Sequence, residues 1–339
     1  MTSLTTVLIV DDEPAVRDLM SRWVVSLGLR AKTVSNADEA LASLRLHHYD
    51  LAVIDVMMPG QDGLWLAGEM QREHPGTAVI VATAYSELLG ANAHQTPIAD
   101  FLIKPFQRDR FALAVDRGRQ WRKLALEEVH SNAMLSIELR DRTAQIVHAL
   151  HDRVSDGESE EDALATLFAN RLPDFAAHGD RVSQYAQSMA RELGMDGSLL
   201  PALEIAARFH DVGKLAMPDS LLSKPSPLTQ GEYTIMRRHA AVGAEILEST
   251  GSLAAGAPVM RASRERLDGV GHAKNVADAA IPLMSRIIAV ADAYDAMTQD
   301  RAYRVRLESS DAVAEILRCS PSQFDPEIVA AFLAVVGRP

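Results

Sequence analysis

Short runs in which nearly every residue is apolar alternate with amphipathic stretches over the first third of the chain. These runs occupy residues 6–10, 52–54, 78–82 and 101–103, with a weaker one at 31–34. Runs without polar alternation are typical of strands buried on both faces of a parallel sheet. Amphipathic helical windows, such as 14–27 and 37–46, separate them. The alternation predicts an α/β doubly wound parallel sheet of five strands.

The hydrophobic pattern changes beyond this predicted sheet. Residues 107–151 contain no proline and a single glycine, Gly118, which favours one long helix. Spacings of 4, 3, 4 and 3 separate a row of mainly apolar residues, namely Leu135, Leu139, Arg142, Ile146 and Ala149. The row fits an ordinary solvated linker helix or a short coiled coil that joins two domains. Residues 162–335 then show helical periodicity with proline and glycine punctuation, which predicts an all-α domain.

Length and composition set further bounds. A chain of 339 residues with 47% apolar and 24% charged residues suggests two globular domains. The formal net charge of −12 argues against a broad nucleic-acid-binding surface. No apolar run approaches the roughly 18 residues of a membrane span, and the N-terminus lacks a signal-peptide pattern. Cys319 is the only cysteine, so no intrachain disulfide can form, and we expect a cytoplasmic protein.

Polar and charged residues follow four of the predicted strands directly. They are Asp11 and Asp12 after the first, Asp55 after the third, Thr83 at the end of the fourth and Lys104 after the fifth. The carboxyl ends of parallel strands line one crevice of an open sheet, where ligands bind. Three carboxylates that converge there require a cation, and an all-oxygen ligand set favours Mg²⁺. The sequence therefore predicts a magnesium site that can receive a phosphoryl group.

These segments resemble the receiver domain of two-component response regulators. The match covers residues 8–13, the run Asp55-Val56-Met57-Met58-Pro59-Gly60-Gln61-Asp62-Gly63, Thr83-Ala84 and Lys104-Pro105-Phe106. The resemblance implies a receiver domain over 1–117, with Asp55 as phosphoacceptor and Asp11, Asp12 and Asp55 around Mg²⁺. It also implies a catalytic role for Thr83 and Lys104, a switch pair of Thr83 and Phe101, and a sensor histidine kinase as partner. A transferred phosphate adds about −1.5 to −2 charge, enough to bias a bistable face.

A second set of candidate ligands lies in the all-α half. An apolar helical run, 203–209, leads into His210-Asp211-Val212-Gly213-Lys214, and adjacent His and Asp side chains can both reach one metal ion. His178, His239 and Asp292 are further candidates, and Asp292 lies in an otherwise apolar run. A buried carboxylate requires a cation or hydrogen-bond donors. Together the residues form a nitrogen and oxygen ligand set that suits Fe, Mn or Zn.

This half resembles the HD superfamily of metal-dependent phosphohydrolases, and more narrowly the HD-GYP domains, which hydrolyse cyclic di-GMP. The narrower match covers 210–214, 218–225, 228–229, 239–247, 281–283, 286–298, 300–304 and 324–326. It implies a helical linker over 118–155 and an HD-GYP-like domain over 156–339. His178, His210, Asp211 and Asp292 would hold one divalent metal, such as Fe or Mn, and Asp211 would bridge to a second metal bound by His239.

The resemblance implies further roles for individual residues. Asp174 stands where some members place a ligand for a third metal, and Lys214 would hold a phosphate oxygen. Asp295, Arg301 and Arg304 would contact the nucleotide. The resemblance thus points to the binding of cyclic di-GMP beside the metal ions.

The sequence departs from the HD-GYP pattern at one segment. Where the family carries two adjacent histidines and later the Gly-Tyr-Pro motif, this chain has Ser263-Arg264 and Gly271-His272-Ala273. The two missing histidines would have held the second metal, so we expect fewer ions than the full family site. Arg264 places a cation where that metal would lie, and His272 is a candidate replacement ligand.

Several functions remain open from the sequence. One is a phosphorylation-regulated cyclic di-GMP phosphodiesterase, and another is a catalytically inactive HD-GYP-like regulator that signals by nucleotide or protein binding. A phosphohydrolase with another nucleotide substrate is a third. GGDEF or other signalling proteins are candidate partners, and the helical linker suggests a homodimer.

Overall fold

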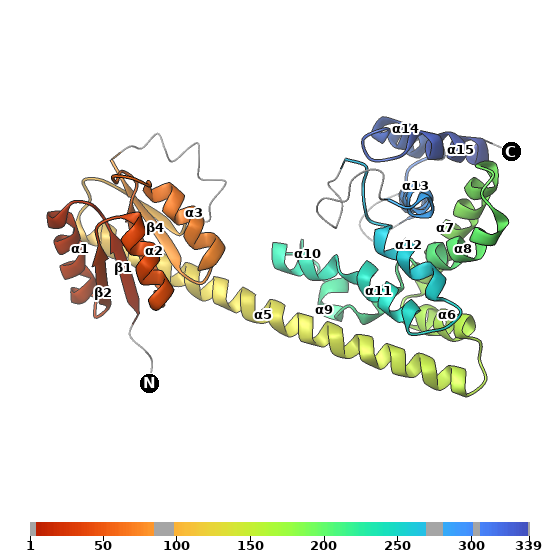
Figure 1. The fold of residues 1–339 in the computed structure, drawn as a ribbon, viewed down its shortest axis with the longest axis horizontal. Coiled ribbons are helices and arrows are strands. Elements are labelled where there is room, and N and C mark those ends of the chain that lie inside the picture. The colour runs from red at the N-terminus through yellow and green to blue at the C-terminus, as the bar shows by residue number, and fades with distance from the viewer. Residues whose placement is uncertain (1–4, 85–97, 269–280, 301–305, 338–339) are drawn as a thin grey trace. The chain divides into compact units, whose positions relative to one another are not determined.

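The computed structural model describes residues 5–84, 98–268, 281–300 and 306–337. Contacts divide the chain into two compact units, Met1–Ser131 and Asn132–Pro339. The long helix α5 (Arg108–Ser155) contributes residues to both units (Figure 1). The single long helix expected from 107–151 is therefore present.

The first unit contains a five-stranded parallel sheet in the order β2-β1-β3-β4-β5, as the pattern of apolar runs predicts. Its strands are β1 (Thr6–Val10), β2 (Arg30–Val34), β3 (Leu51–Asp55), β4 (Ala78–Thr83) and β5 (Asp100–Ile103). Its other helices are α1 (Pro14–Ser26), α2 (Ala37–Leu46) and α3 (Gly63–Glu73). The order reverses between β1 and β3, which is where open α/β sheets of this topology bind ligands.

Alternate residues of each strand point to opposite helix layers. Leu8 and Val10 of β1 are buried against α2 and α3, whereas Val7 and Ile9 are buried against α1 and the first turns of α5. Burial of each such side chain stabilises the fold by about 1.5–3 kcal/mol. This two-sided burial explains why the strands read as continuous apolar runs.

The second unit is helical throughout its described residues. Its α-helices are α6 (Glu160–Arg171), α7 (Pro173–Glu192), α8 (Leu200–Arg208), α9 (Asp219–Leu222), α10 (Gln230–Met236), α11 (His239–Glu248), α12 (Ala257–Ala262), α13 (Leu283–Thr298), α14 (Ser309–Cys319) and α15 (Pro326–Val336). Short 3₁₀ segments are η1 (Gly197–Leu199), η2 (Val212–Ala216) and η3 (Ala254–Gly256). Polar N-caps begin several helices, and Thr229 forms a complete capping box with Glu232 at α10.

The apolar row of the long helix packs inside the second unit. Leu139 is 1% exposed, and Leu135 and Ile146 pack against the same core as Phe168 and Phe209. The row is therefore part of this unit's own core. It is neither a solvated surface nor a free coiled-coil seam.

Candidate functional site

Carboxylates and one lysine meet at the end of the sheet in the first unit. The Nζ of Lys104 lies 2.8 Å from Asp11 Oδ2 and 2.9 Å from Asp55 Oδ2. Asp11 and Asp55 are buried, and one ligand oxygen from each of Asp11, Asp12 and Asp55 lies within 4.8 Å of the others. The structure thus brings together the residues expected to bind Mg²⁺ and a phosphoryl group.

The strand order and one glycine position this cluster. Asp11 follows β1 and Asp55 ends β3, which are neighbours at the point where the strand order reverses. A Cβ on Gly63 would lie 2.0 Å from the backbone oxygen of Asp55, so only glycine lets α3 begin here. Burial raises the pKa of Asp55, while hydrogen bonds to Asp11 and Asp55 outweigh burial and raise that of Lys104. The lysine therefore carries its charge at neutral pH.

The two residues expected to act as a switch lie on adjacent strands. Thr83 ends β4 and is 1% exposed, and its backbone oxygen accepts a hydrogen bond from the backbone N–H of Lys104 at 2.8 Å. Phe101 is half-buried in β5, where it packs against the core on the α2 and α3 side. The switch itself stays a prediction.

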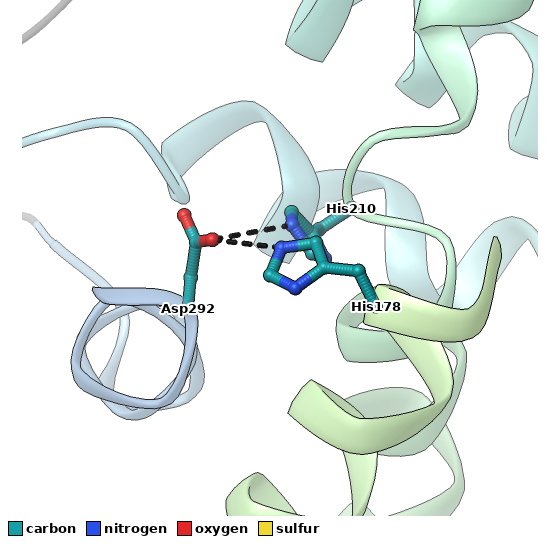
Figure 2. A group of neighbouring side chains, drawn as sticks. All are labelled: His178, His210 and Asp292. Carbon is teal, nitrogen blue, oxygen red and sulfur yellow. Dashed lines mark hydrogen bonds and ion pairs between the residues drawn. The ribbon is translucent and has the colours of Figure 1, made fainter. Parts of the chain in front are cut away.

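Three elements of the second unit bring His178, His210 and Asp292 together (Figure 2). His178 lies on α7, His210 in the turn after α8, and Asp292 on α13. Asp292 Oδ1 is 3.0 Å from His178 Nε2 and 3.7 Å from His210 Nε2. The three ligand atoms lie within 4.8 Å of one another. The helix before His210 ends at Arg208, so His210 lies in the turn that follows the helix and not on the helix itself.

Hydrogen bonds on the far ring nitrogens orient the histidines. The Nδ1–H of His210 donates to the Ala207 oxygen at 2.8 Å, which leaves its buried Nε2 without a hydrogen-bond partner. The Nδ1–H of His178 donates to Asp295 at 2.5 Å, and that of His239 to the Met236 oxygen at 2.8 Å. Such outer contacts fix the tautomer that presents Nε2 to a metal.

The histidine environments differ in charge. Burial lowers the pKa of His210 and lowers that of His239 to about 4, so both rings are neutral at physiological pH. Burial also acts against a charged His178, but hydrogen bonds to Asp292 and Asp295 outweigh it and raise the pKa to about 9. A metal ion would therefore have to displace a proton from His178.

Asp211 is held by two cationic side chains. Lys214 Nζ lies 2.6 Å from its Oδ2, and Arg264 Nη2 lies 2.9 Å from its Oδ1. His239 Nε2 is 3.5 Å from the same Oδ1. Burial would raise the pKa of Asp211, but the charges of Lys214 and Arg264 prevail and hold it well below its usual range.

Gly213 lets the segment that bears Asp211 approach α11. A Cβ at this position would lie 1.9 Å from the backbone oxygen of His239 and 2.5 Å from the backbone nitrogen of Gly243. Backbone atoms cannot rotate away as a side chain would. The glycine of the His-Asp-Val-Gly-Lys motif therefore places Asp211 beside His239, a role that the sequence pattern alone did not indicate.

Asp295 lies in a different setting from the nucleotide contact expected of it. Its side chain is 1% exposed and bonds to His178 and to Arg181 Nε, the latter at 2.7 Å. Asp295 therefore orients the His178 ring through Nδ1, the ring nitrogen opposite the one that faces Asp292. Sequence reasoning missed Arg181, although its position three residues after His178 places both on one face of α7.

The remaining expected residues lie outside this cluster. Asp174 is exposed in the first turn of α7, one turn before His178. Arg301, Arg304 and His272 lie outside the described residues. A cavity of about 340 Å³ lies beside the cluster, lined by Asp292 together with Tyr233, Arg237, Arg264, Arg266 and Phe324 among others.

The ligand geometry suits one divalent ion better than two. His178, His210 and Asp292 offer two imidazole nitrogens and a carboxylate oxygen around a common point, which is the donor set of Fe, Mn or Zn sites. Around His239 and Asp211 the arrangement differs. Arg264 already occupies Asp211 Oδ1, and the hydroxyl of Ser263 donates to the Met260 oxygen at 2.7 Å. The residues present do not fit a second ion there.

Comparison with known proteins places both units in families. Residues 7–116 match the response regulator receiver domain, and residues 162–328 match the HD domain. The chain is 31% identical over 335 residues to the cyclic di-GMP phosphodiesterase response regulator RpfG of Xanthomonas campestris, covering 96% of this chain and 86% of that protein. It is 29% identical over 336 residues to a cyclic di-GMP phosphodiesterase of Thermotoga maritima, covering 97% and 89%.

The chain therefore belongs to the response regulators that join a receiver domain to an HD domain. A shorter match, 35% identical over 169 residues, links half of this chain to 37% of the 3'3'-cGAMP-specific phosphodiesterase 3 of Vibrio cholerae. No described helix has the length and apolar character needed to cross a membrane.

Proposed function

We propose that this protein is a response regulator, phosphorylated on Asp55 by a sensor histidine kinase, whose HD domain acts on cyclic di-GMP. The observation that carries the proposal is the presence of both clusters on one chain. The Asp11, Asp55 and Lys104 cluster lies in one unit, and the His178, His210 and Asp292 cluster lies in the other. Two relatives that match nearly the whole of this chain are named as cyclic di-GMP phosphodiesterases.

In the receiver, Asp11, Asp12 and Asp55 would hold Mg²⁺ and offset the charge of the incoming phosphoryl group. Lys104 already contacts Asp55 and would contact a phosphoryl oxygen. The Thr83 hydroxyl would donate a hydrogen bond to a phosphoryl oxygen, and Phe101 would repack in response. A new charge of about −1.5 to −2 supplies the bias.

In the HD domain, His178, His210, Asp211 and Asp292 would hold a divalent ion such as Fe or Mn. When bound, such an ion polarises a phosphodiester and supplies hydroxide near neutral pH. Lys214 would hold a phosphate oxygen. The cavity beside Asp292 carries three arginines and the ring of Tyr233, which together suit the phosphates and bases of a nucleotide.

A second candidate function is a catalytically inactive regulator that binds a nucleotide or a protein. The observation that favours it is Arg264, which occupies oxygens of both Asp211 and Asp292. GGDEF or other signalling proteins would be the protein partners. We also propose that the chain forms a homodimer and works in the cytoplasm, which suits its single cysteine.

Chromatography of products separates the two functions. The full chain is incubated with cyclic di-GMP and Mn²⁺, or anaerobic Fe²⁺, beside an Asp211→Asn variant of matched shape. Linear pGpG or GMP that the variant does not form would establish the phosphodiesterase. Binding of cyclic di-GMP without product would instead establish the regulator. If the chain neither binds nor hydrolyses cyclic di-GMP, the proposed nucleotide is refuted.

A further inference from the structure

The guanidinium of Arg264 spans two carboxylates that face each other across the HD cluster. Its Nη1 lies 2.6 Å from Asp292 Oδ2 and its Nη2 lies 2.9 Å from Asp211 Oδ1. The side chain is only 24% exposed. Each terminal nitrogen donates to a different residue, so the fork is fixed at two points.

Apart from the proton on His178, which a metal ion would have to displace, the charges in the cluster cancel without any metal ion. The three carboxylates of Asp211, Asp292 and Asp295 are paired with three cations. Lys214 and Arg264 bond to Asp211, Arg264 also bonds to Asp292, and Arg181 bonds to Asp295. A divalent ion is bound less tightly where no negative charge is left to offset it, because uncompensated positive charge is costly in a low dielectric. Here a divalent ion adds two charges to a balanced group.

Arg264 contacts one oxygen of each carboxylate, Asp292 and Asp211. Asp292 Oδ1 faces the Nε2 atoms of His178 and His210, at 3.0 and 3.7 Å, whereas Asp292 Oδ2 faces Arg264. On the other side, Asp211 Oδ1 lies between Arg264 and His239. The Nε2 atoms of His178 and His210 and the Oδ1 atom of Asp292 are therefore left to bind an ion. Asp292 Oδ2 and Asp211 Oδ1 are bonded to Arg264 instead.

We infer that Arg264 is a built-in cation that restricts this site to one divalent ion and weakens the binding of that ion. The inference rests on the proposed metal site and goes beyond it, because it concerns the number and affinity of ions rather than the reaction. The cluster is then stable without metal. Its occupancy depends on the supply of free ion.

Counting bound Mn²⁺ tests the inference directly. The full chain carries Asp12→Ala, which disables the proposed receiver metal site, and is stripped with a chelator and titrated with Mn²⁺ under calorimetry. We expect one ion per chain. Arg264→Gln, which removes the charge but keeps much of the shape, should bind that ion about ten- to a hundredfold more tightly. Arg264→Lys keeps the charge and should bind as the parent does.

Two controls keep the outcomes separate. Arg261→Ala removes an arginine of α12 that bonds to Glu248, outside the cluster, and should leave Mn²⁺ affinity unchanged. The double change Ser263→His with Arg264→His should add a second equivalent of Mn²⁺. Circular dichroism of each variant checks that the chain is folded.

Specific results would overturn the inference. Two ions in the parent would do so, as would equal affinities in folded Arg264→Gln and the parent. If no variant binds Mn²⁺, the proposed metal site fails together with the inference. One ion without turnover of cyclic di-GMP refutes the phosphodiesterase and leaves the inference standing, whereas turnover with two ions refutes the inference alone.

Discussion

Replacement of Gly213 by alanine should separate the two segments that carry Asp211 and His239. The added Cβ would lie 1.9 Å from the His239 oxygen and 2.5 Å from the Gly243 nitrogen, and both atoms belong to the backbone. Because η2 packs directly against α11, the clash has to move one segment away from the other. Overpacking of this kind costs about 1–3 kcal/mol, and we expect the upper end because no side chain can yield.

Calorimetry of the metal-free chain measures this effect. A loss of about 3 kcal/mol corresponds to a drop of roughly 6–12 °C in the melting temperature of a unit of this size. Gly197→Ala is the matched control, because its Cβ would meet nothing within 4 Å and its φ is not positive. That variant should stay within about 0.5 kcal/mol of the parent. Equal melting temperatures for the two variants would refute the close approach that the structure shows.

Three further predictions concern other parts of the chain. Asp55→Asn should abolish phosphoryl labelling by a small-molecule donor, while Asp62→Asn, at the exposed cap of α3, should keep it; labelling of the first variant would remove Asp55 from its role. Arg181→Ala leaves the buried Asp295 bonded to His178 and should lower the free energy of unfolding by about 1–2 kcal/mol in urea, with partial rescue by lysine. In the metal-free chain, the pKa of His178 is raised from 6.5 to about 9, so its stabilisation is complete below pH 6.5 and is lost as the pH rises through 9. The free energy of unfolding should fall by on the order of 3 kcal/mol across that range. An equal fall in a His178→Gln variant would show that His178 is not the group responsible.

The local pattern of the chain determines much of the fold. Continuous apolar runs in the first unit indicate strands buried on both sides, and the observed sheet has the expected parallel order. Because the carboxyl ends of such strands share one edge, Asp11, Asp55 and Lys104 could be grouped before any contact was known. Periodicity also indicates the long helix and the all-helical second unit. These features depend on residues that are close together in the sequence, so the local sequence pattern is enough to predict them.

Tertiary structure decided what depends on distant segments. The row of Leu135, Leu139 and Ile146 has a spacing that suits either a solvated helix or a coiled coil, and only packing against Phe168 and Phe209 shows that it is core. Periodicity reports that a helix face is apolar, but it does not report what covers that face.

The HD cluster shows the same limit at the level of single atoms. The residue types at 178, 210, 211 and 292 suggest a metal site from sequence, and the exchange of histidine for Arg264 suggests a change in it. Which oxygens Arg264 takes, and that Arg181 and Asp295 lie behind His178, follows only from the way α7, α8 and α13 come together. Sequence specifies which charged groups are available. The folded chain decides which of them neutralise one another, because electrostatic pairing depends on distances of a few ångströms between residues far apart in the chain.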